Sequence, residues 1–281
     1  MRYIPKDVDA QVNLPDRHPL ADLVWLGGGL LLIIVVVYLL GGFLIDQLVR
    51  FIPPEYDNRI GAQLPDDFLI EFGEPMVSGE QVERTHAIFE QLKRHLPNDD
   101  PRAYRLVIID TPDINALAIP GGTIVVFRGL LDAATSENEV AMVLAHEFGH
   151  IYHQHHWRRL GRLALLTTGA LLVGSNTSAS NQIAGLSTHA LFQGSNRQQE
   201  AESDRFGVEL LCRYYGHGGG ASDFFERHID KDTLARRSIS LFLTHPLSQE
   251  RVDAIHIHRE KIGCTTNPLS PWLTPSATPL D

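Results

Sequence analysis

Cysteine is scarce in this sequence of 281 residues, which contains only Cys212 and Cys264. Two cysteines are too few for a disulfide framework, and their separation excludes a Cys-x-x-Cys metal site. Spacing along the chain says nothing about proximity in the fold, so a single bridge between them stays open but is not expected. The sequence thus excludes a cysteine-rich scaffold.

Positive charge is also in short supply, because 24 Lys and Arg residues face 34 Asp and Glu residues, for a net charge of −10. This balance argues against nucleic acid or an anionic membrane surface as the main partner. The hydrophobic share of 43% and the charged share of 21% are typical of a globular protein. The length allows one large domain or two small ones.

Charge is absent altogether from Leu23 to Ile45, a run of 23 residues between Asp22 and Asp46. As a helix this run spans about 34 Å, enough for a hydrocarbon core of about 30 Å. A cleavable signal peptide fits less well, because its apolar region is shorter and no Ala-x-Ala site follows; a buried soluble helix is rarely apolar all round. Three basic residues precede the run and two follow it, so the positive-inside rule favours a cytoplasmic N-terminus and an extracytoplasmic remainder.

The segment His146-Glu147-Phe148-Gly149-His150 carries the pattern H-E-x-x-H. In a helix, His146 and His150 lie on one face, one turn apart, where two neutral imidazoles can bind one Zn²⁺. Glu147 points elsewhere on the helix, beside the open metal position, where it can act as a general base. A chance occurrence is the alternative, and the motif alone provides no third ligand.

The run from Glu139 to Arg159 around this motif is predicted to be helical. Ser136 followed by Glu139 forms a capping box at its start. Apolar residues then recur at helical spacing, at positions 140, 143, 144, 148 and 151. The two histidines lie at the edge of this stripe, where a metal would be partly shielded from water.

A second helix is predicted over Arg197–Tyr215, and its acidic residues include candidates for the missing ligand. Glu200 and Asp204 share one side of this helix with Gly207 and Leu211. Acidic groups on the apolar side of a helix need a partner, and a cation is one. Glu200 is therefore the expected third ligand, with Asp204 accepting the second ring N–H of a ligand histidine and Gly207 allowing close helix packing. A solvated acidic helix face is the alternative.

Three short strands are predicted before the metal helix, over residues 104–110, 115–119 and 123–128, with Pro120-Gly121-Gly122 as a tight turn. The last strand is expected to be an open edge that pairs with an extended substrate through backbone hydrogen bonds. The substrate-binding residues would then be Thr123, Ile124, Val125, Val126 and Phe127. An ordinary core hairpin is the alternative.

His245 lies in the sequence Thr244-His245-Pro246 and is expected at or just before the start of a helix over Gln249–Arg259. From such a position it can stabilise an oxyanion or occupy the open metal position at rest. A surface histidine is the alternative. His153, His155 and His156 are interpreted as surface or supporting residues, not as extra ligands.

The remaining segments define domain boundaries. We expect an N-terminal tail over 1–22, a membrane helix over 23–45, a connector over 46–98, a peptidase domain over 99–264 and a disordered tail over 265–281. The connector includes a helix from Ser78 to His95 that begins with a capping box at Ser78 and Gln81. The uncharged stretch 163–196 predicts a helix too short to span a bilayer, then a loop that acts as a lid, skims the membrane or simply lies on the surface. Another helix is predicted over 221–237.

Three stretches resemble the membrane-anchored gluzincin metallopeptidases, the family of the CAAX prenyl protease, the heat-shock protease HtpX and the Oma-type mitochondrial protease. They are NALAIPGGTIVVFRGLL (115–131), HEFGH (146–150) and EAESD (200–204), and Thr244-His245-Pro246 followed by Arg251 also fits. The family pattern in the third stretch is E-x-E-A-D, so Ser203 is a conservative departure. The resemblance covers about residues 99–259. It is closest to the single-span Oma-like or periplasmic chaperone-protease branch.

The resemblance implies an α+β protein, with a mainly helical zincin-like peptidase domain, a small β-sheet and one preceding transmembrane helix. It implies one Zn²⁺ per chain, held by His146, His150 and Glu200, with Glu147 as the base. The implied activity is endopeptidase cleavage of misfolded or membrane-associated proteins, on the periplasmic side. Two rival hypotheses are a chaperone-like or autoinhibited binding module with a closed zinc site, and a non-peptidase zinc hydrolase. No nucleic-acid partner is expected, and the oligomeric state is left open.

Overall fold

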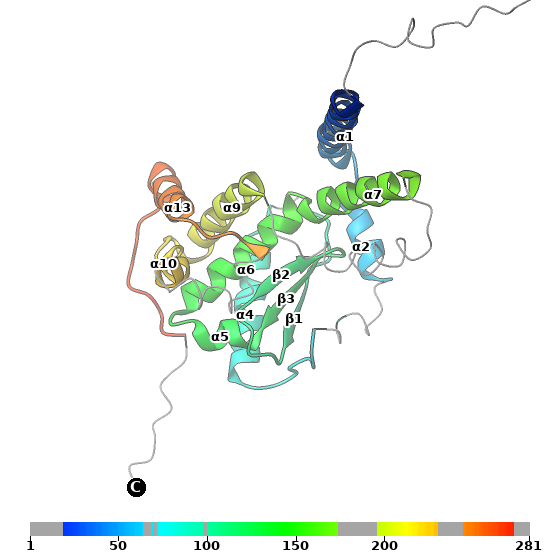
Figure 1. Cartoon of the computed structure of the whole chain (residues 1–281). Coiled ribbons are helices and arrows are strands. Elements are labelled where there is room, and N and C mark those ends of the chain that lie inside the picture. The colour runs from blue at the N-terminus through cyan, green and yellow to red at the C-terminus, as the bar shows by residue number, and fades with distance from the viewer. Residues whose placement is uncertain are drawn as a thin grey trace, which may run out of the picture.

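A computed structural model describes residues 19–63, 69, 72–97, 100–173, 196–229 and 244–272. This part of the chain is mainly helical and has one three-stranded sheet (Figure 1). In chain order the elements are α1 (Pro19–Val49), α2 (Glu55–Gly61), α4 (Glu80–Arg94), β1 (Arg105–Ile109), β2 (Ala116–Ile119), β3 (Thr123–Phe127), α5 (Arg128–Ala133), α6 (Glu137–Tyr152), α7 (His155–Val173), α9 (Arg197–Tyr215), α10 (Asp223–Ile229) and α13 (Gln249–Lys261). The predicted α+β class, with a leading apolar helix, is confirmed.

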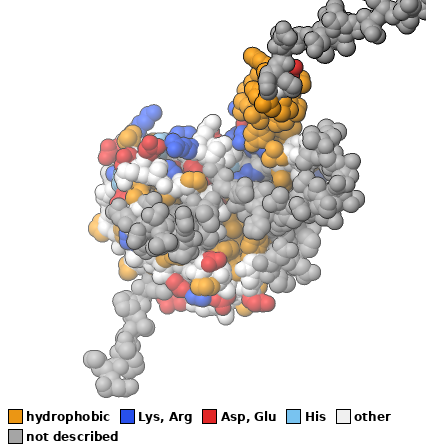
Figure 2. All heavy atoms as spheres, viewed as in Figure 1, with side chains coloured by type: hydrophobic (Ala, Val, Ile, Leu, Met, Phe, Trp, Pro, Cys, Tyr) orange, Lys and Arg blue, Asp and Glu red, His pale blue; other side chains and the backbone are white. Residues whose placement is uncertain are grey.

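Helix α1 marks the chain as a membrane protein. It has a mean hydropathy of 2.7 over its most apolar stretch, and none of that stretch is buried. Hydrophobic side chains cover it where it rises above the body (Figure 2). Within the described residues it is the one helix long and apolar enough to cross a membrane. It extends beyond the predicted run of 23–45 at both ends.

The sheet has the strand order β1-β3-β2, with β3 parallel to β1 and antiparallel to β2. Strand β3 is therefore central, and all five of its residues are buried. The prediction that Thr123–Phe127 form an open edge for substrate is wrong, because neighbouring strands already use the hydrogen bonds on both sides of β3. Residues 74–76 add two backbone bonds to the outer edge of β1, which leaves β2 as the edge beside α6.

Helix α6 is the buried centre of the domain, and its start only partly follows the predicted capping box. The hydroxyl of Ser136 accepts a bond from the backbone N–H of Glu139. The carboxylate of Glu139 does not return to Ser136; it accepts from Thr135 and pairs with Arg227 on α10. This ion pair ties α10 to the first turn of α6.

The predicted helical run Glu139–Arg159 is two helices, because α6 ends at Tyr152 and α7 begins at His155. Gln154 at this break has a φ of 57°, in the left-handed region. The connector helix also differs from its prediction: α4 begins at Glu80 after Gly79, and no side chain caps it. Gly79 has a φ of 117°, which glycine adopts without strain and Ser78 would not.

Helices α6 and α9 pack at very short range, as predicted for Gly207. A Cβ at Gly207 would lie 2.9 Å from the end of the Met142 side chain. A Cβ at Gly149 would lie 2.9 Å from Cα of Ser203. Both glycines therefore allow backbones to approach where a methyl group would separate them.

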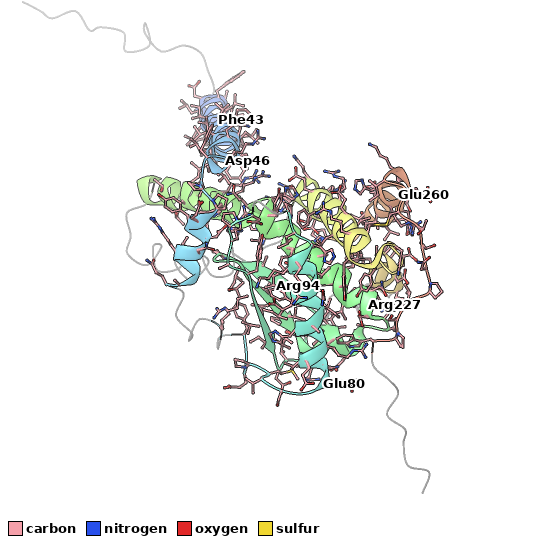
Figure 3. All side chains as sticks on the ribbon, turned by 180° about the vertical axis from the view of Figure 1, so that it is seen from behind. Phe43, Asp46, Glu80, Arg94, Arg227 and Glu260 are labelled. Atoms are coloured by element: carbon pink, nitrogen blue, oxygen red, sulfur yellow. A yellow bond between two sulfur atoms is a disulfide. The ribbon has the colours of Figure 1, made fainter. Side chains whose placement is uncertain are left out.

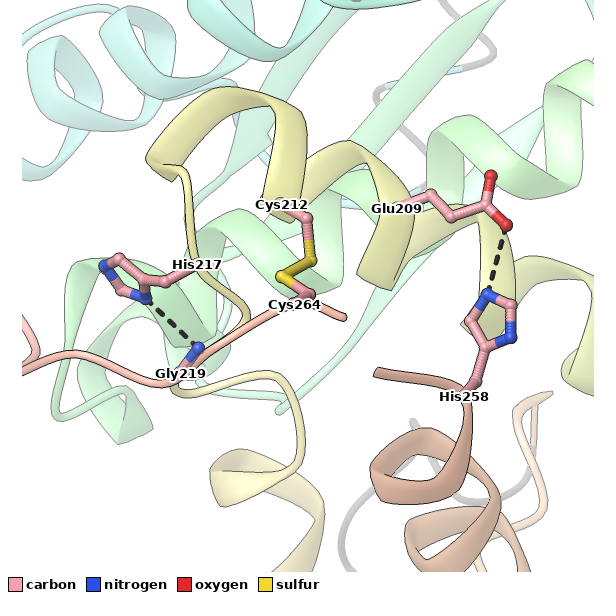
Figure 4. The surroundings of a disulfide bond; sticks show 6 residues. All are labelled: Glu209, Cys212, His217, Gly219, His258 and Cys264. Carbon is pink, nitrogen blue, oxygen red and sulfur yellow. Dashed lines mark hydrogen bonds and ion pairs between the residues drawn. A yellow bond between two sulfur atoms is a disulfide. The ribbon is translucent and has the colours of Figure 1, made fainter. Parts of the chain in front are cut away.

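The two cysteines form a disulfide, which corrects the expectation of unpaired thiols. Cys212 near the end of α9 is joined to Cys264 just after α13 (Figure 4). Residues 265–272, predicted to belong to a disordered tail, are packed against the domain. Trp272 is buried and donates its backbone N–H to Thr135. The disulfide thus holds the start of residues 265–272 to α9, although their composition predicts a disordered tail.

Several predictions concern residues outside the described ranges. These are most of the N-terminal tail, the loop expected within 174–195, the second half of the helix expected over 221–237 and the end of the C-terminal tail.

Candidate metal centre

Four buried side chains meet where α6, α9 and the turn before α13 come together. His146 and His150 lie on α6, Glu200 lies in the first turn of α9, and His245 lies in the turn. One potential ligand atom from each residue lies within 4.8 Å of all the others. Their exposed fractions are between 1% and 4%. The three ligands predicted from sequence are thus brought together, and His245 joins them.

The spacing of the donor atoms fits a tetrahedral metal ion. Nε2 of His146 lies 3.0 Å from Nε2 of His150 and 3.5 Å from Oε2 of Glu200. Nε2 of His150 lies 3.4 Å from Oε1 of Glu200. Zinc bonds of about 2.0–2.2 Å at tetrahedral angles separate neighbouring ligand atoms by about 3.3–3.6 Å. These separations, of which the two to Glu200 run to different oxygens, are close to those between neighbouring ligand atoms of Zn²⁺.

His245 lies against the same donor atoms. Its Nδ1 lies 3.3 Å from Nε2 of His146 and 3.1 Å from Oε1 of Glu200. The other ring nitrogen, Nε2, lies 3.5 Å from a carboxylate oxygen of Glu147. In this conformation the fourth coordination position of a metal, which is predicted from sequence to be open, faces the imidazole of His245.

A carboxylate and an arginine support His146 from behind. Oδ1 of Asp204 lies 2.9 Å from Nδ1 of His146, as predicted. Arg251 donates to both oxygens of Asp204, at 2.7 and 2.9 Å, and pairs with Glu200 at 2.7 Å. Burial raises the pKa of Asp204, but Arg251 and His146 outweigh it and hold the pKa below its ordinary value. The charged Asp204 therefore stands 2.9 Å from Nδ1 of His146, where it favours a proton on this nitrogen and leaves Nε2 as the atom that would bind a metal.

His150 is oriented in the same way by a second histidine. Its Nδ1 lies 2.8 Å from Nδ1 of His155, whose Nε2 lies 3.0 Å from Oε2 of Glu202. Burial lowers the pKa of His155 to about 4, so this ring is neutral near pH 7. With its proton on Nε2 facing Glu202, His155 accepts from Nδ1–H of His150 at its other nitrogen. Nε2 of His150 is then free to bind a metal.

The cluster attracts positive charge strongly. Burial lowers the pKa of His146, but hydrogen bonds to Asp204 and Glu200 outweigh burial and raise it to about 10. Burial raises the pKa of Glu200, but the charge of His245 and hydrogen bonds from the histidines hold it well below its ordinary value. Two buried carboxylates facing converging ring nitrogens form a donor set suited to Zn²⁺.

Glu147 is the carboxylate with unmet hydrogen-bonding capacity. It is 1% exposed, and among the described residues neither of its oxygens has a hydrogen-bond partner. A buried carboxylate without donors is unfavourable, so such groups usually face a water, an ion or a substrate. Its position beside the donor set matches the role of a base predicted from the motif.

Strand β2 borders a small cavity beside the donor set. Leu117 and Ala118 line it together with Glu147, His150 and His245. Because β2 is antiparallel to β3, its residues alternate between bonding β3 and pointing their backbone groups outward. The bond from Phe127 N–H to the carbonyl of Asn115 sets this alternation, so the N–H and C=O of Ala118 point away from β3.

Some residues of the site were not assigned from sequence. Arg251 appeared only as part of a family match, and nothing in its local pattern indicated that it joins α13 to Asp204. The sequence predicts His155 only as a surface or supporting residue. Its contact with His150 is not predicted, because that contact depends on the break between α6 and α7 at Gln154. Asn115 accepts a bond from Thr244 and so joins β2 to the turn that carries His245. Such contacts depend on folding and leave no periodic signal.

Comparison with known proteins gives a consistent result. The family model "Peptidase family M48" matches residues 80–258. The chain is 24% identical to the mitochondrial metalloendopeptidase OMA1 of Schizosaccharomyces pombe, over 72% of this chain and 60% of that one. It is 30% identical to the metalloprotease LoiP of Escherichia coli, over 63% of this chain and 70% of LoiP.

A third relative is the beta-barrel assembly-enhancing protease of E. coli, 29% identical over 53% of this chain and 33% of that one. The chain therefore spans about a third of this relative and three fifths of OMA1.

Proposed function

Because this chain belongs to peptidase family M48, we propose that it is a membrane-anchored zinc-dependent endopeptidase. The observation that supports this most is the meeting of a buried, converging His/Glu donor set with the carboxylate of Glu147, whose oxygens lack a hydrogen bond. His146, His150 and Glu200 would hold the metal, with Asp204 and His155 orienting the two histidines.

A bound zinc ion would supply Lewis acidity and make an adjacent water more acidic. Glu147 accepts the proton of the attacking water and then delivers it to the leaving amine. Arg251 keeps Asp204 and Glu200 charged and in place, at 2.7 Å from an oxygen of each. His245, which lies 3.5 Å from Glu147 in this conformation, would donate to the oxyanion of the scissile carbonyl once it is displaced from the donor set.

The substrate would be an extended polypeptide that pairs with the outward edge of β2. This edge is supported by the outward backbone groups of Ala118 and by its position on the cavity beside Glu147. Backbone pairing recognises extended chains with little side-chain selectivity. Misfolded or membrane-associated proteins are the proposed class, in keeping with relatives that include an assembly-enhancing protease and a mitochondrial metalloendopeptidase.

The position of His245 favours a site that is closed at rest. An imidazole in the fourth position blocks the place where water must stand, so it has to move before cleavage. This observation also supports the rival function, a binding module whose zinc site stays shut. The peptidase function is preferred because a permanently closed site would not require a buried carboxylate at Glu147 that lacks a hydrogen bond.

We place the domain on the extracytoplasmic side. The disulfide between Cys212 and Cys264 supports an oxidising compartment, where such bridges persist. The balance of basic residues around α1 points to the same side.

The decisive variant is Glu147→Gln, which keeps the size of the side chain and removes the base. We expect it to bind zinc like the wild type and to have lost proteolysis of an unfolded model substrate. Glu200→Ala, in contrast, should lose bound zinc, measured by elemental analysis of the purified protein. Substantial cleavage by a clean Glu147→Gln preparation would rule out the mechanism.

The closed state is tested separately by His245→Ala. If His245 blocks the fourth position, basal cleavage in this variant rises above the wild type while the zinc content is retained. A variant that binds zinc but shows no rise would remove the blocking role and leave the peptidase function standing.

A further inference from the structure

Helix α7 lies across the lower end of α1, in both views of the molecule (Figures 1 and 3). Two glycines make this crossing close. A Cβ at Gly41 of α1 would lie 2.5 Å from the side chain of Leu165, and one at Gly161 of α7 would lie 2.6 Å from the side chain of Ile45. An ion pair between Asp46 and Arg162, at 2.7 Å, closes the contact.

The crossing occurs at the depth of the membrane boundary. The uncharged run of α1 ends at Ile45, and Gly41 lies four residues, or about 6 Å, before that end. The bilayer core, about 30 Å thick, needs most of the 23-residue run to cross it. Helix α7 therefore meets α1 where hydrocarbon gives way to headgroups. Helices that lie in this zone bury their apolar face by about 5–10 Å.

The composition of α7 suits that zone. Its first two turns carry Arg158, Arg159 and Arg162, and its remainder from 163 onward has no charged residue. Leu166 on this helix is 53% exposed, and Leu48 near the end of α1 is 65% exposed. The exposed Leu166 thus lies on a helix that packs against α1, which itself requires lipid.

The start of α7 is bound both to the segment that follows α1 and to the metal centre. The side chain of Gln154 donates to the carbonyl of Ile52, just after α1. Asp57 on α2, fully buried, accepts from Nε2 of His156 at 2.6 Å and from the indole N–H of Trp157 at 2.9 Å. His155, the first residue of α7, contacts His150. The start of α7 therefore contacts the metal centre, and its middle crosses α1 at the membrane boundary.

We propose that α7 is an interfacial helix, inserted by its Leu166 side into the bilayer that holds α1. The metal centre is then fixed just outside the headgroups, and its substrates are chain segments close to the membrane surface. Only this statement about substrates rests on the proposed peptidase function.

The test measures the depth of Leu166 in full-length protein. Because both native cysteines are bridged, Leu166→Cys adds a single free thiol that can carry an environment-sensitive fluorophore. The matched control is Val77→Cys, 87% exposed and three residues before Glu80, which lies at the far end of the molecule from Phe43 (Figure 3). Each protein is reconstituted in vesicles of phosphatidylcholine with a minor share of phosphatidylglycerol.

We expect the label at position 166 to emit at shorter wavelength and to be quenched by a spin label on the lipid acyl chain, but not by aqueous iodide. The label at position 77 should show the opposite. Iodide quenching at both positions would overturn the proposal. So would a blue-shifted label at 166 that lipid-borne quencher does not reach, because the site would then be covered by protein, including a second copy of the chain.

The statement about substrates has its own test. Leu166→Glu places a charge in the interfacial zone without touching the metal centre. We expect it to lose cleavage of a polypeptide tethered to the vesicle surface and to keep cleavage of the same polypeptide in solution. An unchanged ratio of the two rates would refute the substrate class. Cleavage that is absent even in the wild type would instead count against the peptidase function, and the depth measurement would be unaffected.

Discussion

The contact between α6 and α9 at Gly149 makes a sharp prediction about the metal centre. A Cβ at this position would lie 2.9 Å from Cα and 3.2 Å from the carbonyl oxygen of Ser203. Both are backbone atoms, which cannot rotate aside. Bringing the shorter contact to an ordinary distance of about 3.4 Å requires the helices to separate by about 0.5 Å. Gly149→Ala should therefore disturb any distance that joins the two helices.

The distances most affected are those between ligands. His150 follows Gly149 on α6, and Glu200 precedes Ser203 on α9 by less than one turn, with 3.4 Å between their donor atoms. Metal–ligand bonds tolerate about 0.2 Å of error, less than the separation expected here. Gly149→Ala should thus bind zinc more weakly, measured by competition with a chromogenic chelator.

Two other glycines provide a graded control. At Gly207 the nearest atom is the flexible end of Met142, at 2.9 Å, so Gly207→Ala should be milder. At Gly169 on α7 nothing lies within 4 Å. Gly169→Ala should gain up to about 1 kcal/mol of helix propensity and leave zinc binding unchanged.

The same propensity gain applies at Gly149, so the difference between the Gly149 and Gly169 variants isolates the steric term. We expect Gly149→Ala to be less stable than Gly169→Ala by about 1–3 kcal/mol, the usual effect of overpacking. Thermal unfolding of both proteins in the same detergent measures this. Equal stability and equal zinc affinity of the two would refute the claim that backbone contact at Gly149 sets the geometry of the site.

Three further predictions concern the supports of the site. Replacing Cys212 and Cys264 by Ala should lower the free energy of unfolding by up to about 4 kcal/mol, from the entropy of a 52-residue loop, with urea unfolding under oxidising and reducing conditions as the measure. Arg251→Met should weaken zinc binding about 10- to 100-fold by releasing Asp204, visible in the chelator assay; unchanged affinity would mean that Asp204 needs no help. Burial raises the pKa of Asp57, but His156 and Arg102 outweigh burial, so the pKa lies below its ordinary value of about 3.8. The charged carboxylate therefore stabilises the folded protein above about pH 3.8, and this stabilisation is lost as the pH falls below that value. The urea midpoints of wild type and Asp57→Asn should therefore differ at pH 7 and converge in acid, and a gap that persists would contradict this account.

The chemistry of the site was predictable from sequence because it is local. H-E-x-x-H needs only helical spacing to place His146 and His150 on one face, and Glu200 and Asp204 were identified by the same periodicity. These residues do meet in the structure. Periodicity predicts which residues share the face of one helix. It does not predict which faces of two helices meet, and Gly207 was the one residue that indicated this from sequence.

The errors have a common physical origin. The order β1-β3-β2 depends on which strands pair, and three short apolar runs carry no information on that, so the edge was assigned to β3 instead of β2. The break at Gln154 depends on a single left-handed residue, and Gln has no special preference for that conformation. The bridge between Cys212 and Cys264 requires the chain after α13 to return to α9, a long-range event that no local pattern records.

The position of His245 limits how the site can open. Pro246, its neighbour, accepts a hydrogen bond from Arg251 at 3.0 Å, and Arg251 is bound to Asp204 on α9. The disulfide also holds the end of α13 to α9, so a swing of α13 as a whole would dismantle the support of His146 and Glu200 together with the closed position. The movement that admits water must therefore be confined to the turn itself. Among the described residues, the turn is also tied by the bond from Thr244 to Asn115, at the start of β2, and by the contacts of His245 with Glu200 and Glu147. A substrate strand added to β2 arrives beside this bond, which makes substrate binding the natural trigger for release of His245.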